Sequence, residues 1–163
     1  IRAAQAAIEE VAESLERQQH QGPRTMRHAV TGKPVTWADP AIGLRNAIAP
    51  PLVIEHTDTG RCWTEFTLGA PYEGPPGRVH GGVIAWLLDA ALSRALHAAF
   101  RLGVTGTLNI RYLAATPIED SIHCRARITG QEGRKIFVEG GIWHGDTQTV
   151  SAEGIWLTPK SLG

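Results

Sequence analysis

The stretch YEGPPGRVHGGVIAWLLDAALSRAL, residues 72–96, joins a loop that interrupts regular structure to a long apolar segment. Residues 72–78 are rich in proline and glycine, which is typical of a turn or loop. From residue 83 to residue 92 nearly every side chain is apolar, and at this length the pattern predicts a helix buried on all sides. We therefore expect the rest of the chain to fold around this one helix.

The junction between loop and helix has the features of a reactive site. Two glycines, Gly81 and Gly82, lie where the helix begins, so a ligand can approach the free backbone N–H groups at the positive end of the helix dipole. Asp89 is the one charged residue within the apolar run. Because burying an unpaired carboxylate is costly, Asp89 needs a partner or a catalytic role.

Outside this stretch, turn-rich sequences separate segments with the composition of strands. Residues 52–56 and 61–68 flank Thr57-Asp58-Thr59-Gly60 as a hairpin, and Gly145-Asp146 marks a second hairpin near the end of the chain. Strands are expected at residues 52–56, 61–68, 105–113, 122–129, 135–144 and 149–157. A strand pair, a long helix and four further strands predict an α+β protein in which an antiparallel sheet encloses one helix.

The loop and the helix start also resemble a known family. Gly74-Pro75-Pro76-Gly77, then His80-Gly81-Gly82, then an aspartate nine residues after the histidine, are similar to the motif of the PaaI-like acyl-CoA thioesterases of the hotdog fold. The resemblance covers roughly residues 50–159. It implies a hotdog thioesterase domain over residues 50–163, preceded by an N-terminal helical extension over residues 1–49.

The extension itself is predicted to be mostly helix and loop. Ala4, Ile8, Val11 and Leu15 recur at helical spacing, which predicts an amphipathic helix ending near residues 21–23. A helix that covers sheet surface is the simpler interpretation, and an arm that docks on another subunit or caps the substrate is the alternative. Residues 22–39 are expected to be loop, and Asp39-Pro40 is expected to open a short helix through about residue 47.

Composition limits the classes of function. The chain of 163 residues fits one domain, and its formal net charge of +0 argues against a nucleic-acid partner. No apolar run approaches the ~20 residues that span a bilayer, and the first residues lack the pattern of a signal peptide. Cys62 and Cys124 have no metal-ligand spacing, nor do the histidines. We expect a cytoplasmic protein with no membrane partner, no metal and no cofactor except the coenzyme A of its substrate.

Asp89 is the strongest catalytic candidate, either as a nucleophile or as a base that activates water. The N–H of Gly81 can polarise a thioester carbonyl and stabilise the oxyanion that forms, although tight packing explains a glycine there equally well. Gly82 has the same two interpretations, with packing favoured. His80 either donates a hydrogen bond to the carbonyl or orients the loop.

Further residues are assigned by the resemblance. It places Thr105 at the start of the strand after the helix, close to the acid, when the chain is aligned through Leu108-Asn109-Ile110-x-Tyr112. Thr107, expected on the same face, is the alternative if that alignment shifts. Many relatives carry an asparagine where this chain has Gly74. That difference leaves open how water is positioned and makes Glu73 a weaker second acid.

Arg134 and Lys135 follow Gly133 at the head of a predicted strand. In similar proteins this turn lies near the nucleotide part of coenzyme A, and two cations suit phosphate recognition. An ordinary solvated basic turn is equally compatible with the sequence.

Together these residues predict an acyl-CoA thioesterase that hydrolyses a thioester to a carboxylate and free coenzyme A. A non-catalytic acyl-CoA binding domain and a hotdog hydratase or dehydratase are the alternatives. Gly81 and Asp89 are eight residues apart, or ~12 Å along a helix, so one helix can hardly present both to one carbonyl. We expect a homodimer with shared active sites, which can pair further into a homotetramer.

Overall fold

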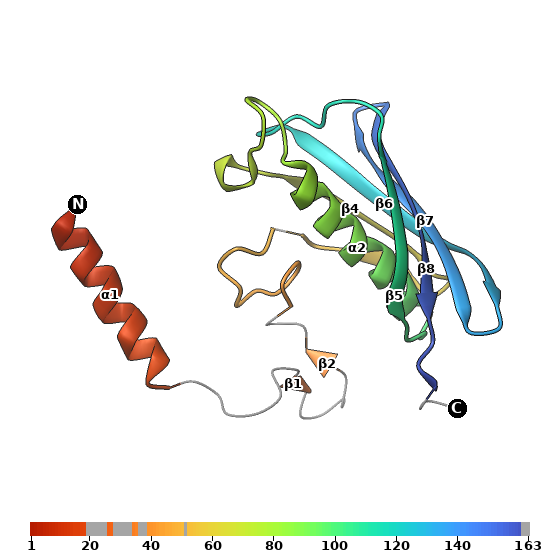
Figure 1. Cartoon of the computed structure of the whole chain (residues 1–163), viewed down its shortest axis with the longest axis horizontal. Helices are drawn as coiled ribbons and strands as arrows, with labels where there is room; N and C mark the ends of the chain where they lie inside the picture. Colours follow the sequence, from red (N-terminus) through yellow and green to blue (C-terminus); the bar gives the residue numbers. More distant parts are fainter. Residues whose placement is uncertain (19–25, 28–33, 36–38, 51, 161–163) are drawn as a thin grey trace.

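The structure, a computed structural model, describes residues 1–18, 26–27, 34–35, 39–50 and 52–160. Its largest part is a six-stranded antiparallel sheet that curves along one side of the long helix α2, Gly81–Ala98 (Figure 1). The strand order across this sheet is β3-β4-β6-β7-β8-β5, with β3 and β5 at the edges. The six strands are β3 (Glu55–Thr57), β4 (Arg61–Thr67), β5 (Val104–Tyr112), β6 (Ser121–Glu132), β7 (Lys135–His144) and β8 (Thr147–Leu157).

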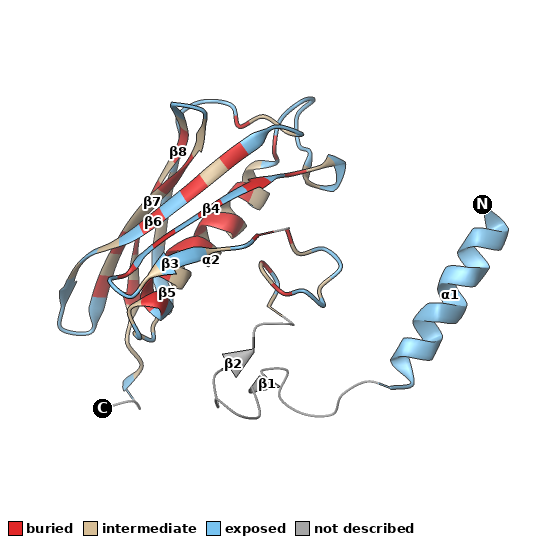
Figure 2. Cartoon of the chain, turned by 180° about the vertical axis from the view of Figure 1, so that it is seen from behind, coloured by how far each residue is buried: buried red, intermediate tan, exposed pale blue. Residues whose placement is uncertain are grey.

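The strands alternate between buried and exposed side chains, as expected for a sheet with one face against the core. Along β4, Cys62, Thr64 and Phe66 are buried while the residues between them are exposed, and Figure 2 shows such banding on neighbouring strands. The hairpin between β3 and β4 turns at Gly60, whose φ of 79° is readily adopted only by glycine. All six predicted strands are present, although β3 begins three residues later than expected and β6 continues to Glu132.

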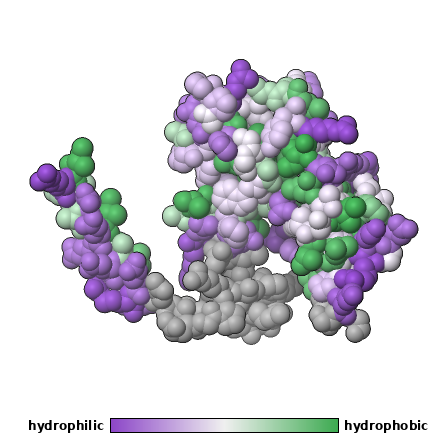
Figure 3. Space-filling model, in the orientation of Figure 1, coloured by the Kyte–Doolittle hydropathy of each residue, from purple (hydrophilic) through white to green (hydrophobic). Residues whose placement is uncertain are grey.

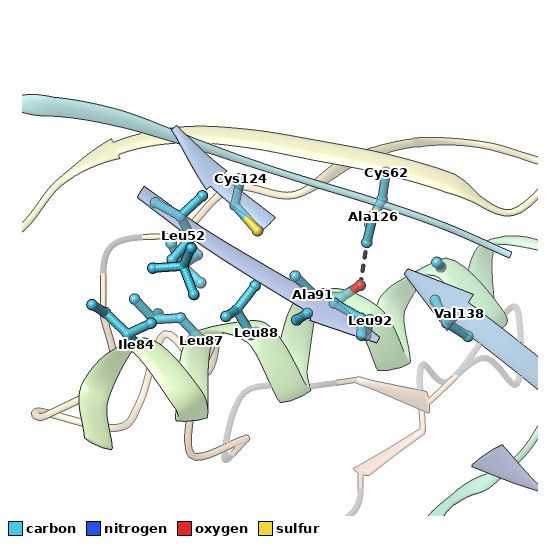
Figure 4. Close-up of a cluster of buried hydrophobic side chains, with 14 of the residues drawn as sticks. Leu52, Cys62, Ile84, Leu87, Leu88, Ala91, Leu92, Cys124, Ala126 and Val138 are labelled. Carbon is cyan, nitrogen blue, oxygen red and sulfur yellow. Dashed lines mark hydrogen bonds between the residues drawn. The ribbon is translucent and has the colours of Figure 1, made fainter. Parts of the chain in front are cut away.

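The core lies between α2 and the sheet. Leu88 and Leu92 are fully buried there, and α2 comes so close to β7 that a Cβ on Gly140 would lie 2.9 Å from Leu92 Cδ1. Cys62 Sγ donates a hydrogen bond to the carbonyl of Ala91 at 3.2 Å (Figure 4). Burial raises the pKa of the Cys62 thiol to about 11, so Cys62 is a neutral core residue.

The prediction that the helix is buried on all sides is wrong for the single chain. The sheet covers one side of α2, whereas Trp86, Asp89, Ala90 and Ser93 on the other sides are only half-buried. A run of apolar residues indicates a helix surface that is buried from water. It does not indicate whether the chain's own sheet or another molecule buries that surface.

The N-terminal helix α1, Arg2–Glu16, also differs from the simpler expectation. Each of its residues is exposed, and Figure 1 shows it well separated from the sheet. Ile8, Val11 and Leu15 are exposed to 60% or more, and green and purple residues lie side by side on α1 in Figure 3. The prediction that this helix covers sheet surface is therefore wrong. It ends at Glu16, and its predicted end near residues 21–23 lies outside the described residues.

Two predictions for the rest of the extension also need correction. Within the expected loop, the short strands β1 (Met26–Arg27) and β2 (Pro34–Val35) pair with each other. Asp39 caps a turn as predicted, since its Oδ1 accepts from the N–H of Ala41 and of Ile42. Residues 40–49 nevertheless form successive turns and no helix. Gly43 and Asn46 favour this outcome, because Asn46 Oδ1 accepts a turn-forming hydrogen bond from the N–H of Ile48 at 3.2 Å.

Candidate active site

The N-terminus of α2 is capped by a histidine. His80 Nδ1 accepts a hydrogen bond from the N–H of Gly82 at 3.0 Å, so Nδ1 is unprotonated and a neutral ring carries its proton on Nε2. The N–H of Gly82 is therefore occupied. No described residue accepts from the N–H of Gly81, which leaves this donor available at the positive end of the helix.

Gly81 has room for a side chain. The atoms nearest to a Cβ built on it belong to Tyr112, at an ordinary contact distance of 3.6 Å. Packing within the chain thus does not require glycine here. The hydroxyl of Tyr112 donates to the carbonyl of Gly81 at 2.8 Å and fixes the helix start against the end of β5. Sequence reasoning did not identify this role, because a tyrosine at the end of a strand carries no specific signal.

The geometry of the loop before the helix explains why residue 74 is a glycine. A Cβ on Gly74 would lie 2.8 Å from the Cα of His80, so any side chain there would collide with backbone. The carboxylate of Glu73 accepts from the N–H of Gly77 at 2.7 Å and holds the same loop. In the described structure Glu73 therefore stabilises the loop.

Asp89 and Thr105 meet in the structure. Thr105 Oγ1 donates to Asp89 Oδ1 at 2.9 Å, which joins the middle of α2 to the start of β5. Asp89 is half-buried, so its carboxylate can be reached from outside the chain. At the same time the hydroxyl of Thr105 holds one of its oxygens. A carboxylate with one oxygen fixed by a hydrogen bond keeps its second oxygen for a substrate or water.

The expectation that Thr105 and Thr107 share a face is wrong. Thr105 lies opposite Trp156, which is fully buried, whereas Thr107 lies opposite Ile155 on the other side of β8. The register shifts between the two threonines, because a bulge at Gly106 inserts one residue into the strand. Of the two, only Thr105 contacts the acid.

The candidate residues thus lie in two groups at opposite ends of β5. Gly81 and Tyr112 form one group, and Asp89 and Thr105 form the other. Gly81 and Asp89 are eight positions apart on α2, so within one chain the two groups lie ~12 Å apart along the helix. A single chain does not bring the N–H of Gly81 and the carboxylate of Asp89 to one reacting carbonyl.

The predicted basic turn lies at the same end of the sheet as Thr105. Lys135 pairs with Leu157 on β8, and Leu157 pairs with Val104, the residue before Thr105. Two strand spacings, about 10 Å, separate β7 from β5. Arg134 is partly occupied, since its Nε donates to the carbonyl of Thr158 at 2.8 Å.

Within the described ranges, no three side chains of histidine, cysteine, aspartate or glutamate come close enough to hold a metal ion. No helix among the described residues has both the length and the apolar character to cross a membrane.

Comparisons with known proteins agree with the expected fold. The sequence profile of the thioesterase superfamily matches residues 76–151. A crystal structure of a thioesterase superfamily protein is 34% identical, with a TM-score of 0.86 over 96% of this chain and 81% of that chain. The predicted hotdog fold is confirmed.

The curated relatives are longer than this chain, and other solved structures are less similar to it. The acyl-coenzyme A thioesterase THEM4 of Bos taurus is 31% identical over 109 residues, which are 67% of this chain and 45% of that protein. The chain spans less than half the length of the curated relatives it matches. A hypothetical thioesterase from Streptococcus pneumoniae, solved with coenzyme A, is 18% identical with a TM-score of 0.62 over 66% of this chain and 87% of that one. It has also been solved with an aspartate or a threonine replaced by alanine.

Proposed function

Because the chain belongs to the thioesterase superfamily, we propose that it hydrolyses acyl-CoA thioesters to a carboxylate and free coenzyme A. The observation that carries the proposal is the hydrogen bond from Thr105 to Asp89, which holds a half-buried carboxylate on a helix otherwise rich in apolar residues. The names of the relatives and the coenzyme A bound by the Streptococcus pneumoniae protein support the same substrate class.

In the proposed reaction, the N–H of Gly81 donates a hydrogen bond to the thioester oxygen and stabilises the negative charge that develops there. Asp89 either attacks the carbonyl carbon directly or takes a proton from an attacking water. The C–S bond then breaks, and the sulfur leaves with coenzyme A and takes up a proton. When water attacks, the acyl group leaves directly as a carboxylate. When Asp89 attacks, the acyl group is held on Asp89 as a mixed anhydride, and water then hydrolyses this anhydride to release the carboxylate and restore Asp89. His80 orients the helix start by capping it, and Thr105 orients Asp89.

The spacing of two substituted residues in the Streptococcus pneumoniae protein adds support. In the Streptococcus pneumoniae protein the substituted aspartate and threonine are sixteen residues apart in sequence. Asp89 and Thr105 are also sixteen residues apart, and they are in contact. We propose on this basis that the two positions correspond.

The active site is proposed to form between two copies of the chain. β5 is an edge strand, and no described strand pairs with its outer row of N–H and C=O groups. Antiparallel pairing of two β5 strands about a two-fold axis lays the Thr105 end of one beside the Tyr112 end of the other. That arrangement brings Asp89 of one copy toward Gly81 of the second, as a single carbonyl requires.

A free-thiol assay with a panel of acyl-CoAs tests the activity. Release of coenzyme A is expected for at least one acyl-CoA. Tight binding without release would instead indicate the non-catalytic binding domain, and hydration of an enoyl-CoA without release would indicate the hydratase. The cytoplasmic location remains a prediction.

Subunit complementation tests the shared site. Gly81→Pro and Asp89→Asn are each expected to be inactive alone. In a mixed dimer, Gly81 of the Asn chain faces Asp89 of the Pro chain, so one intact site returns. Activity should therefore reappear on mixing under conditions that exchange subunits. If exchange is demonstrated and no activity returns, the shared-site arrangement is wrong. Gly81→Ala, which fits the available space, serves as the folding control.

A further inference from the structure

Trp86 is a large apolar side chain on the side of α2 that the sheet leaves uncovered. It is half-buried, and among the described residues it belongs neither to the buried core nor to the partly buried side chains that pack against the core. Its indole N–H donates to no described residue. Trp156 on β8 differs in both respects, since it is fully buried and its Nε1 donates to Ser93 Oγ at 3.1 Å. Trp86 thus has the features of a side chain that contacts another molecule.

Trp86 lies one helical turn before Asp89. Residues three positions apart on a helix are neighbours on its surface, with ~5–6 Å between their Cβ atoms. Both residues are half-buried, and both lie on the part of α2 that the sheet does not cover. A thioester whose carbonyl carbon reaches Asp89 therefore has one of its two substituents within reach of the Trp86 indole.

The substituent that extends toward Trp86 is the acyl group. The basic turn of Arg134 and Lys135 lies at the Thr105 end of the sheet, where Asp89 also lies, whereas Trp86 is nearer the N-terminus of α2. Coenzyme A with its phosphates at this turn extends from the carbonyl away from Trp86. The acyl group, on the opposite side of the carbonyl carbon, then extends toward Trp86.

The shared site limits the space in that direction. When Gly81 of one copy meets Asp89 of the second, and the reverse, the two-fold axis passes level with residue 85, midway between the two positions. Trp86 stands next to this axis in each copy, so the two indoles lie between the two sites. Each carbonyl is four helix positions, or ~6 Å, from the axis.

We infer that Trp86 closes the acyl-binding space and restricts the substrates to thioesters of short acyl groups. The indole occupies the region between the two α2 helices, so a long alkyl chain that extends from the carbonyl collides with it. Forcing extra methylenes into occupied space is costly, which makes the collision selective. This role of Trp86 rests on the proposed function and on the shared site.

The test measures kcat/KM for butanoyl-CoA and dodecanoyl-CoA with wild type and with Trp86→Ala, below the concentration at which dodecanoyl-CoA forms micelles. Wild type should prefer butanoyl-CoA at least about tenfold, a ratio within reach of a pocket that discriminates by size. Trp86→Ala should raise kcat/KM for dodecanoyl-CoA at least about tenfold and change that for butanoyl-CoA by less than about threefold.

Trp63→Ala is the matched control. Trp63 is 42% exposed on the side of β4 turned away from the core, so the ratio of the two kcat/KM values should keep its wild-type value in this variant. Trp86→Leu serves where Trp86→Ala does not fold. Leucine keeps an apolar side chain of smaller volume and should shift the ratio in the same direction by at least about threefold.

Binding of butyl-CoA and dodecyl-CoA thioethers, which have no thioester carbonyl to hydrolyse, tests the acyl-binding space without the reaction. Wild type should bind the dodecyl compound no more tightly than the butyl compound. By titration calorimetry, Trp86→Ala should bind the dodecyl compound at least about tenfold more tightly than wild type does. If no acyl-CoA releases coenzyme A, the proposed function is wrong, and these dissociation constants still decide whether Trp86 limits acyl length.

A wild type that prefers dodecanoyl-CoA overturns the inference. A Trp86→Ala variant that changes kcat/KM for both substrates by the same factor also overturns it, since that result assigns Trp86 to packing between the copies. Thioether dissociation constants whose ratio Trp86→Ala leaves at the wild-type value overturn it as well.

Discussion

The two sides of α2 are held by different interactions. On the side facing the sheet, Leu88 and Leu92 are fully buried against β-strands of the same chain. On the other side Asp89 is half-buried, and its described contact is the hydroxyl of Thr105 on an edge strand. The first side supplies the stability of the fold, whereas the second leaves a carboxylate accessible beside a surface that the single chain does not cover. One helix thus provides both the core of the chain and the proposed chemistry.

The largest expected effect falls on the second side. Asp89→Asn should lower kcat/KM for coenzyme A release by about 100-fold to 10,000-fold, the usual contribution of a positioned base or nucleophile. The melting temperature should change little, because asparagine has nearly the same shape and still accepts from Thr105. An Asn variant with wild-type turnover on the best substrate would show that Asp89 is structural.

The opposite result is expected on the sheet side. Leu92→Ala should reduce the free energy of unfolding by about 2–5 kcal/mol, since it leaves a cavity where α2 approaches Gly140 most closely. Turnover per folded molecule should stay within about twofold. Leu92→Met, which conserves volume, should cost less than about 1.5 kcal/mol by denaturant unfolding. If Leu92→Ala instead abolished turnover in protein that remains folded, the two sides would not be separable.

The sequence predicted this helix and its neighbouring strands well, because their signals are local. The two turns at residues 57–60 and 145–146 indicate the hairpins that contain β4 and β7, and the apolar run indicates α2. The same pattern could not show that one side of α2 lacks cover, nor that the apolar residues of α1 meet no sheet. Both are questions of which molecule supplies the covering surface, and spacing along one chain does not contain that information.

Prediction of the candidate site from the sequence was also limited by what local patterns contain. The contact between Asp89 and Thr105 was predicted through the family resemblance, and the structure places them in contact. The side of the sheet on which Thr107 lies was predicted wrongly. Alternation assumes an unbroken strand, whereas the bulge at Gly106 shifts the pairing register by one residue. An isolated glycine within a strand pattern was the available signal for that bulge.

The bulge offers a way to sharpen the contrast between the two threonines. Thr105→Val should lower kcat about tenfold by removing a hydrogen bond to a charged group. Thr107→Val, an identical change two residues away on the opposite face, should stay within about twofold. Steady-state kinetics on both variants makes each the control of the other. Equal losses in the two variants would mean that strand stability, and not the contact with Asp89, explains the effect.

The smallest expected effect concerns the basic turn at Arg134 and Lys135. This turn lies at the Thr105 end of the sheet and belongs to neither side of α2. Arg134→Ala combined with Lys135→Ala should raise KM for acyl-CoA about three- to tenfold at low salt, with kcat nearly unchanged, as expected for uniform binding of a distant phosphate. Exposed charges are screened by salt, so the difference from wild type should shrink as ionic strength rises. Arg2→Ala with Arg17→Ala removes two exposed cations at the two ends of α1 and is the matched control. Because Arg134 also donates to the carbonyl of Thr158, unfolding must be measured in parallel. If KM is unchanged at low salt in a variant as stable as wild type, the turn is ordinary surface. If KM rises and the rise persists at high salt, the substitutions have altered the shape of the binding site and have not removed a phosphate contact.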